Sequence, residues 1–331
     1  MKKNNIIISS RIRLARNLEG YPFGERLSSQ KATEIIDKVG GLLRENGFEV
    51  IDFSTLSPNE AASYVEKHLA SREFAMSKLP HALLLNKPCG LSVMLCEEDH
   101  LRIQAILPGL ALDEAYRNAC SVDDLVDGHF DIAFDETLGY LTHCPTNLGT
   151  GMRASVMMFL PALTMAGRID PLARQLSKIG LTVRGTFGEG TSSIGSLYQI
   201  SGQVTLGITE ENAIKKLCDM VRQIEEQETA LRALITKEKN PKLIDRIHRA
   251  EGTLRHAFML SSGEFLSLYS DARLGASLGL LENVSEDTLD ALLEEVMPAT
   301  LLLDATTPPK NEIERDVLRA ERIKARLVDK R

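Results

Sequence analysis

Three arginines stand close together near the start of the 331-residue chain, in the segment Ser9-Ser10-Arg11-Ile12-Arg13-Leu14-Ala15-Arg16. The isoleucine-rich run before them, at residues 5–8, predicts a short strand. If that strand continues, Arg11 and Arg13 project from one face and could bind one multivalent anion, because a guanidinium holds phosphate oxygens in a fork. The alternative is a basic edge that faces solvent.

A run of carboxylates, Glu97-Glu98-Asp99, follows an apolar stretch and precedes His100. Such groups could bind Mg²⁺ through water or supply a general base. The alternative is an acidic turn, which Arg102, four residues after Glu98, would partly neutralise.

Two glycine-rich segments could approach an anion through their backbone N–H groups. The first, Cys144-Pro-Thr-Asn-Leu-Gly-Thr-Gly-Met-Arg153, lacks the Gly-Lys-Ser/Thr of a Walker loop. The second begins Arg184-Gly-Thr-Phe-Gly-Glu189 and suits a loop that closes over substrate. A plain surface loop remains the alternative for the second segment.

The elements that must position these groups can be read from the hydrophobic pattern. A helix is expected over 29–46, and Ser57 with Pro58 and Glu60 forms a capping box for a second helix that runs to about His68. Strands are expected at 82–86 and 91–96, with shorter strand-like runs at 98–104 and 129–142.

After Gly207 the pattern becomes helical. Thr209 caps a long helix whose first turn carries two glutamates, and most of the remaining chain is helical, interrupted by Asn240-Pro241, near Gly279 and by Pro308-Pro309. We therefore expect a mixed α/β part followed by a helical bundle, with the boundary near residue 230.

Composition limits the class of protein. Charged residues number 39 Lys+Arg and 46 Asp+Glu, a net charge of −7, which argues against general nucleic-acid affinity. No run of 18 apolar residues could span a membrane, and the N-terminal apolar stretch is too short for a secretory signal. An odd number of cysteines without a CxxC pair indicates a reduced, cytosolic compartment: Cys89, Cys96, Cys120, Cys144 and Cys218.

Taken together, four motifs resemble the catalytic domain of the phosphagen (guanidino) kinases, from about residue 6 to 209: SSRIRLAR, EEDHLRI, CPTNLGTGMRA and RGTFGEG. QISGQVTLG at 199–207 and the helical last third are more similar to the bacterial McsB-type protein-arginine kinases. The resemblance implies an α+β fold: a catalytic domain at 1–230, with an antiparallel sheet flanked by helices, and an all-α domain at 231–331.

The resemblance also implies an ATP site. Five arginines would surround the phosphates: Arg11, Arg13, Arg102, Arg153 and Arg184. The other implied ATP-binding residues are Ser9, Ser10, Ile12, His68, Ala154, Ser155, Val156, Met157, Gly185, Thr186, Phe187, Gly188 and Glu189. His68 would pack against adenine, although it could equally be an ordinary histidine at a helix end.

The implied acceptor is a guanidinium held between two carboxylates. Glu98 matches the family's base and Glu189 its second glutamate, while Glu97 and Asp99 would act on Mg²⁺ through water without binding it directly. Cys144 matches the active-site thiol and would assist by charge. Three positions depart from the family pattern: Cys96 replaces an asparagine, Ser201-Gly202 replaces Ser-Asn, and Thr205 stands where small-molecule kinases carry arginine.

Near the C-terminus, RDVLRA resembles the phosphoarginine-binding motif of the McsB branch: Arg315, Asp316, Val317, Leu318, Arg319 and Ala320. From spacing alone, Arg315, Arg319, Arg322 and Arg326 would form a solvated helical stripe. The resemblance favours an allosteric phosphoarginine pocket instead.

The resemblance implies a cytoplasmic Mg·ATP-dependent kinase for arginine side chains in proteins. Since SSRIRLAR begins at residue 9, we expect no helical N-terminal domain over the acceptor side, which leaves room for a polypeptide. The implied partners are unfolded proteins, a heat-shock repressor, a zinc-binding activator, a Clp ATPase/protease of the stress response and a second copy in a homodimer; neither nucleic acid nor membrane is expected. A free-guanidine kinase and a non-catalytic phosphoarginine reader are the rival functions.

Overall fold

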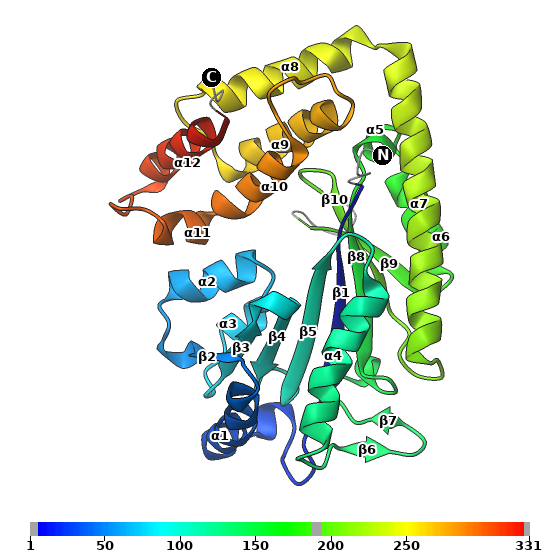
Figure 1. The fold of residues 1–331 in the computed structure, drawn as a ribbon, viewed down its shortest axis with the longest axis vertical. Helices are drawn as coiled ribbons and strands as arrows, with labels where there is room; N and C mark the ends of the chain where they lie inside the picture. Colours follow the sequence, from blue (N-terminus) through cyan, green and yellow to red (C-terminus); the bar gives the residue numbers. More distant parts are fainter. Residues whose placement is uncertain (1–5, 187–192, 328–331) are drawn as a thin grey trace.

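The computed structural model describes residues 6–186 and 193–327. Within them, eight strands form one antiparallel sheet in the order β2-β3-β4-β5-β1-β8-β10-β9 (Figure 1). Its strands are β1 Ile7–Arg16, β2 Glu49–Asp52, β3 Ala82–Asn86, β4 Leu91–Leu95, β5 Leu101–Pro108, β8 Met152–Phe159, β9 Leu181–Gly185 and β10 Leu197–Gly202. A separate small hairpin pairs β6 Phe134–Asp135 with β7 Gly139–Tyr140. The expected α+β class is confirmed.

One face of the sheet is covered by helices. These are α1 Ser29–Glu45, α4 Leu112–Asp127, α6 Ile169–Ser177 and α7 Glu210–Glu238. Their apolar sides share one core with strand residues such as Ile12, Leu14 and Val156, all almost fully buried. The short α5, Pro161–Met165, packs against α7. The covered face is therefore structural, and chemistry must use the other one.

Most elements expected from local sequence signals formed where those signals stood, but the run expected at 98–104 is a strand only from Leu101 onward, and 129–142 holds no strand beyond the short β6 and β7. Ser57 and Glu60 make the reciprocal capping box that begins α2, Pro58–Glu66, and Thr209 accepts the N–H of Asn212 to begin α7. The expected strands at 82–86 and 91–96 correspond to β3 and β4. With α3, Arg72–Ala75, α2 packs around Phe53 and Phe74 beyond the other face of β3 and β4.

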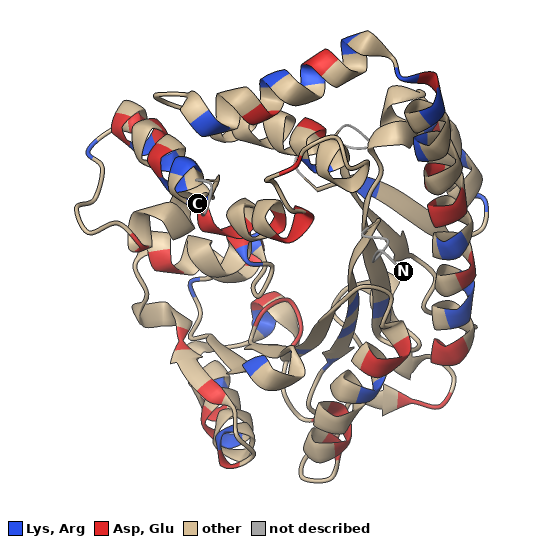
Figure 2. Cartoon of the chain, turned by 45° about the horizontal axis from the view of Figure 1, so that its top comes forward, with Lys and Arg blue, Asp and Glu red and all other residues tan. Residues whose placement is uncertain are grey.

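Strand register gathers the arginines on one face. Arg13 on β1 stands opposite Arg153 on β8, and Ala15, two residues along β1, stands opposite Arg102 on β5. Because side chains alternate along a strand, Arg11 and Arg13 share this face, while Ile12 points into the core. Figure 2 shows basic positions recurring on these neighbouring strands.

The C-terminal part forms a helical domain with its own core, built around side chains such as Phe265, Leu289 and Ile323. Its helices are α8 Pro241–His256, α9 Ser262–Ser277, α10 Glu286–Glu295, α11 Pro298–Leu303 and α12 Glu312–Leu327. The boundary expected at residue 230 falls inside α7. No helix in the described part of the chain combines the length and apolarity that crossing a membrane requires.

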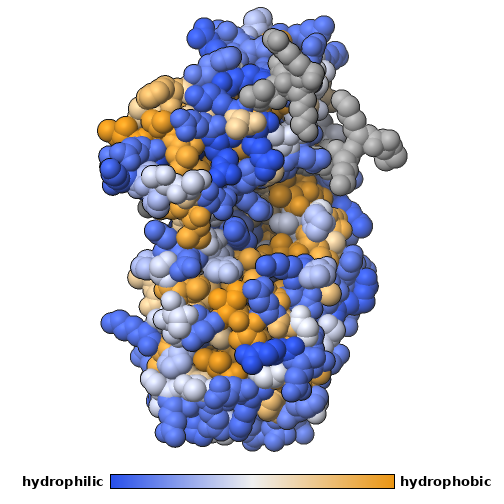
Figure 3. Space-filling model, turned by 60° about the vertical axis from the view of Figure 1, so that its left-hand side comes forward, coloured by the Kyte–Doolittle hydropathy of each residue, from blue (hydrophilic) through white to orange (hydrophobic). Residues whose placement is uncertain are grey.

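Contacts at two places join the domains. Arg232, in the last part of α7, pairs with the buried Glu228 and donates to the carbonyl of Phe159 on the catalytic side, and it also donates to Ser277 of α9 at 3.4 Å. On the other side of the molecule, Glu66 at the end of α2 accepts hydrogen bonds from the start of α11. Viewed from the side of α2 and α11, the molecule narrows between its lower and upper parts (Figure 3).

Candidate active site

Arg11 lies at the centre of the uncovered sheet face. Its Nη2 donates to Gln199 on β10 at 2.6 Å, and its Nε donates to Ser155 on β8 at 3.3 Å. Burial, and secondarily the charge of Arg102, lower the pKa of Arg11 to about 10. A guanidinium with so little water around it gains strongly from a bound anion.

Arg13 is the most constrained of the arginines. Burial lowers its pKa well below the usual value, and the nearby charges of Arg11, Arg102 and Arg153 act in the same direction. Its Nε is buried and has no hydrogen-bond partner among the described residues. Buried donors are normally paired, so an unpaired Nε amid like charges indicates a site for a polyanion such as a triphosphate.

Next to Arg13 lies a cavity of about 180 Å³, lined by Arg13, Ala15, Glu98, Arg102, Cys144, Asn147, Gly151 and Arg153. Three separate segments of the sequence, at 13–15, 98–102 and 144–153, thus meet at one cavity. It contains cations, one carboxylate and one thiol, which is the combination expected where a phosphoryl group meets its acceptor.

The three consecutive carboxylates have different environments. Glu97 is nearly buried and accepts hydrogen bonds from Ser71 and Arg102, each at 2.6 Å. Glu98 is more open, contacts Arg102 at 3.3 Å, and has its pKa raised by burial and by the neighbouring carboxylates. Of the three, only Glu98 lines the cavity. Its availability and raised pKa fit a general base.

Asp99 is 1% exposed and does not line the cavity. Its Oδ1 accepts the side-chain N–H of Asn17 and the backbone N–H of His143, both at 2.7 Å. Asp99 therefore holds the segment that precedes Cys144. Its Oδ2 is buried without a described hydrogen-bond partner.

The loop after Cys144 forms one wall of the cavity. Cys144 Sγ lies 3.1 Å from Thr146 Oγ1, and Arg153 donates to Asn147 and Thr146. Gly149 has a φ of +99°, and a Cβ there would collide with the carbonyl oxygen of Thr205. The glycine thus permits the close approach of two backbones, which packs the loop against the sheet.

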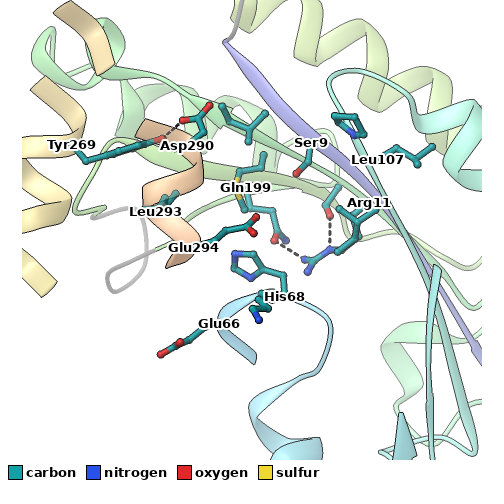
Figure 4. Close-up of a pocket in the computed structure, with 16 residues that line it drawn as sticks. Ser9, Arg11, Glu66, His68, Leu107, Gln199, Tyr269, Asp290, Leu293 and Glu294 are labelled. Carbon is teal, nitrogen blue, oxygen red and sulfur yellow. Dashed lines mark hydrogen bonds between the residues drawn. The ribbon is translucent and has the colours of Figure 1, made fainter. Parts of the chain in front are cut away.

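A second cavity of about 300 Å³ extends from Arg11 to His68 (Figure 4). His68 has a left-handed backbone (φ 59°), and its carbonyl accepts the Nε2 hydrogen of Gln104 at 2.9 Å. Burial, with a smaller effect of Arg11, lowers the pKa of His68 to about 4. The imidazole is therefore neutral at pH 7 and offers a flat, uncharged surface.

The structure brings most of the expected ATP residues to these cavities, but not all. Ser9, Ser155 and Met157 line the second cavity with Arg11 and His68. Arg184 lies on β9 opposite Gln199 and is exposed, with Gly185 and Thr186 following it. The side chains of Ser10, Ile12, Ala154 and Val156 are buried on the opposite, helix-covered face. Phe187, Gly188 and Glu189 lie outside the described residues.

Several residues at the cavities have no strong sequence signal. Gln199, which holds Arg11, could have been found only through the alternation of polar residues along β10. The cavity wall from the C-terminal domain, with Tyr269, Asp290, Leu293 and Glu294, depends on tertiary packing. No local pattern predicts such a contact.

The described residues provide few ligands for a magnesium ion on their own. No group of three or more His, Cys, Asp or Glu side chains in the described ranges could hold a metal ion. Mg²⁺ commonly binds phosphate oxygens and water with few protein ligands. Glu98 is the carboxylate that such an ion could approach through water, since Glu97 and Asp99 are occupied by Arg102 and Asn17.

The RDVLRA segment lies on α12, and its two arginines differ in how deeply they are buried. Arg319 is fully buried and donates to the carbonyls of Val296 and Leu260 and to Asp316. Ala320 is also buried, while Arg315, Val317 and Leu318 are partly exposed. Arg315 Nε and Arg319 Nη2 are buried without a described partner. The motif is therefore partly structural, and two of its guanidinium nitrogens have no partner among the described residues.

Comparison with known proteins identifies the family. Residues 31–231 match the ATP:guanido phosphotransferase C-terminal catalytic domain, and residues 240–331 match the protein-arginine kinase McsB C-terminal domain. The protein-arginine kinase of Clostridium acetobutylicum is 44% identical over 91% of this chain and 90% of its own length. That of Syntrophomonas wolfei is 43% identical over 98% of this chain and 92% of its own length.

Solved structures agree on the fold. A duplicated taurocyamine kinase from Schistosoma mansoni, with bound transition-state analogue components, has a TM-score of 0.61 at 28% identity, and covers 68% of this chain and 33% of its own. A lombricine kinase has a TM-score of 0.60 at 23% identity, over 70% of this chain and 68% of its own. The chain therefore belongs to the protein-arginine kinase branch of the ATP:guanido phosphotransferase family.

Proposed function

We propose that this protein transfers the γ-phosphoryl group of ATP to the guanidinium of arginine side chains in proteins. The observation that carries the proposal is the single cavity at which Arg13, Arg102 and Arg153 meet Glu98 and Cys144. The family membership and the names of the relatives support the same reaction.

Phosphoryl transfer needs positioned charge more than covalent chemistry. Arg11 and Arg13, on one strand, would bind successive phosphates, and Arg153 would hold the end nearest the acceptor, directly opposite Arg13. Each guanidinium is fixed by the sheet and loses little conformational entropy on binding. Mg²⁺ held by the nucleotide would neutralise phosphate charge.

Glu98 would act on the acceptor. An arginine guanidinium is a poor nucleophile because its proton has a pKa above ~12. A carboxylate at one nitrogen orients that nitrogen toward the γ-phosphorus and accepts its proton as the P–N bond forms, while the bond from that phosphorus to the bridging oxygen breaks and ADP leaves. Cys144 would assist by negative charge as a thiolate, and Glu189 would be the second carboxylate of the acceptor site.

In the test, the protein is incubated with Mg·ATP and with two acceptors together, an arginine-rich unfolded protein and free arginine. Mass spectrometry at neutral pH, where P–N bonds persist, should find phosphoarginine on the protein. The Glu98→Ala variant should lose the label. Label confined to free arginine would identify a free-guanidine kinase, and phosphoarginine binding without any label would identify a non-catalytic reader.

We further propose that α12 binds phosphoarginine. The unpaired buried Arg315 Nε and Arg319 Nη2 support an anion at this place. Membership of the branch also motivates the proposed roles in a cytoplasmic stress response: a homodimer, a zinc-binding activator, a heat-shock repressor and unfolded proteins as substrates, and delivery of phosphorylated proteins to a Clp protease. In the test of the α12 site, a protein that carries phosphoarginine should bind the wild type and fail to bind the Arg315→Ala variant.

A further inference from the structure

The second cavity lies between the two domains rather than within the catalytic domain. On the catalytic side, the apolar side chains of Ile106, Leu107 and Met157 form its floor, next to His68. On the other side, Tyr269 of α9 and Leu293 of α10 complete the wall (Figure 4). Ligand sites commonly occupy such interdomain positions. A nucleotide in this cavity would touch both domains.

Three carboxylates line this cavity, and two are already engaged. Glu66 accepts the N–H groups of Ala299 and Thr300 at 2.8 Å each. Asp290 accepts hydrogen bonds from Arg273 at 2.7 and 2.9 Å and from Tyr269 at 2.7 Å. Both groups are therefore fixed by the protein itself.

Glu294 is the third carboxylate, and its circumstances differ. It is exposed, it lies on α10, and it forms no hydrogen bond or ion pair with any residue in the ranges 6–186 and 193–327. Its carboxylate is thus available to a ligand in the cavity. Figure 4 shows Glu294 near His68, with Arg11 reaching toward them from β1.

The chemical groups of a nucleotide determine which part of it the carboxylate of Glu294 can contact. A carboxylate repels phosphates, and the phosphates would lie with the arginines, so Glu294 must face the nucleoside. A carboxylate accepts hydrogen bonds from ribose hydroxyls, as acidic residues do in dinucleotide-binding folds. The apolar floor and the flat imidazole of His68 suit the base.

We propose that Glu294 accepts hydrogen bonds from the ribose hydroxyls of ATP, so that the helical C-terminal domain contributes a specificity-determining residue to the nucleotide site. The inference rests on the proposed function, because it requires that this cavity binds ATP. It adds a residue from outside the matched catalytic domain, which ends at residue 231.

The test measures binding of Mg·ATP and of Mg·2′,3′-dideoxyATP by calorimetry, without an acceptor. In Glu294→Gln, the Kd for ATP should rise about tenfold, equivalent to ~1.4 kcal/mol, because the charged acceptor is lost. The Kd for the dideoxy nucleotide should match that of the wild type. Asp287→Asn, an exposed change on the same helix away from the cavity, should alter neither value.

Two outcomes would overturn the assignment: an unchanged Kd for ATP in Glu294→Gln, or an equal loss for both nucleotides. A loss of discrimination between ATP and inosine triphosphate in the variant would instead make the base amine the partner of Glu294. Failure of the proposed function looks different: a non-catalytic wild type would bind no ATP, and a free-guanidine kinase would bind ATP but leave proteins unlabelled.

Discussion

Asp99 Oδ1 accepts a 2.7 Å hydrogen bond from the backbone N–H of His143, the residue before Cys144. This contact joins the acidic turn after β4 to the glycine-rich loop, so that the carboxylate of Glu98 and the thiol of Cys144 line one cavity. The role expected of Asp99 was contact with magnesium through water. Its burial gives it a positioning role in the loop itself.

Replacing Asp99 by alanine should destabilise the protein by about 3 kcal/mol, because two hydrogen bonds to a buried carboxylate are lost. Phosphorylation of protein substrate should also fall, since the Cys144 loop loses its anchor. Asp99→Asn retains the accepting oxygen and should lose less of both. Urea unfolding and initial rates measure the two effects. Equal activity of Asp99→Ala and wild type would contradict the positioning role.

On the acid side of the pH–rate profile, protonation of Glu98 should make the rate fall at a pH above the range in which an ordinary glutamate titrates. Burial raises its pKa, so the base is protonated, and the rate falls, at a higher pH than the usual value of 4.5 predicts. The same shift lowers stability as the pH rises, because the folded protein binds this proton more tightly than the unfolded chain. Glu98→Gln should therefore be inactive yet slightly more stable at pH 7. Loss of stability in this variant would contradict that sign.

Cys96 stands where the family usually carries asparagine, and the structure gives a physical meaning to that position. Its φ is +63°, a left-handed conformation that asparagine adopts more readily than cysteine. Cys96→Asn should raise the free energy of unfolding by about 1 kcal/mol. The new amide could donate to the carbonyl of Ala32, which the thiol now contacts at 3.7 Å. A lower unfolding midpoint would mean that packing of the sulfur outweighs the relieved backbone strain.

Local signals predicted local structure well. The capping box at Ser57 and the threonine cap at Thr209 each formed, because capping depends on residues within one turn. Alternation along β1 placed Arg11 and Arg13 on one face, as the strand period requires. Arg16 is one residue out of phase, and strand alternation alone separates it from that face.

The contacts between distant segments could not be predicted in this way. Gln199 holds Arg11 across 188 residues, and Glu66 caps α11 across more than 230. The first pair depends on the order of strands in the sheet and the second on how the two domains pack, and neither leaves a periodic pattern in the sequence. Nor did spacing reveal that Arg319 is fully buried, because a helical stripe of arginines looks the same whether it faces water or a core.

Arg315 and Arg319 should differ sharply when replaced. Arg319→Ala removes donors to Val296 and Leu260 and leaves Asp316 unpaired, which should cost about 3 kcal/mol of stability. Arg315→Ala should leave the unfolding midpoint nearly unchanged and reduce phosphoarginine binding. Thermal unfolding and binding of a phosphoarginine peptide separate the two. A strongly destabilised Arg315→Ala would show that this arginine is structural as well.

Arg13 and Arg16 provide the clearest contrast within one motif. Arg16 is buried, forms a forked contact with Asp123 at 2.7–3.0 Å, and lies 3.4 Å from the ring centre of Tyr140. Removing Arg16 leaves the buried carboxylate of Asp123 without its ion-pair partner, so Arg16→Ala should lose about 3 kcal/mol of stability.

Arg13→Gln should affect ATP binding rather than stability, in contrast to Arg16→Ala. The charge of Arg13 is disfavoured by burial and by three neighbouring arginines, so the neutral side chain should leave stability unchanged or raise it. ATP affinity should fall at least tenfold, because one charge-assisted hydrogen-bond donor to phosphate is lost. Urea unfolding and calorimetry of ATP binding give both values for each variant. If Arg13→Gln were destabilised while its ATP affinity was unchanged, Arg13 would be a structural residue and the triphosphate would have to bind elsewhere.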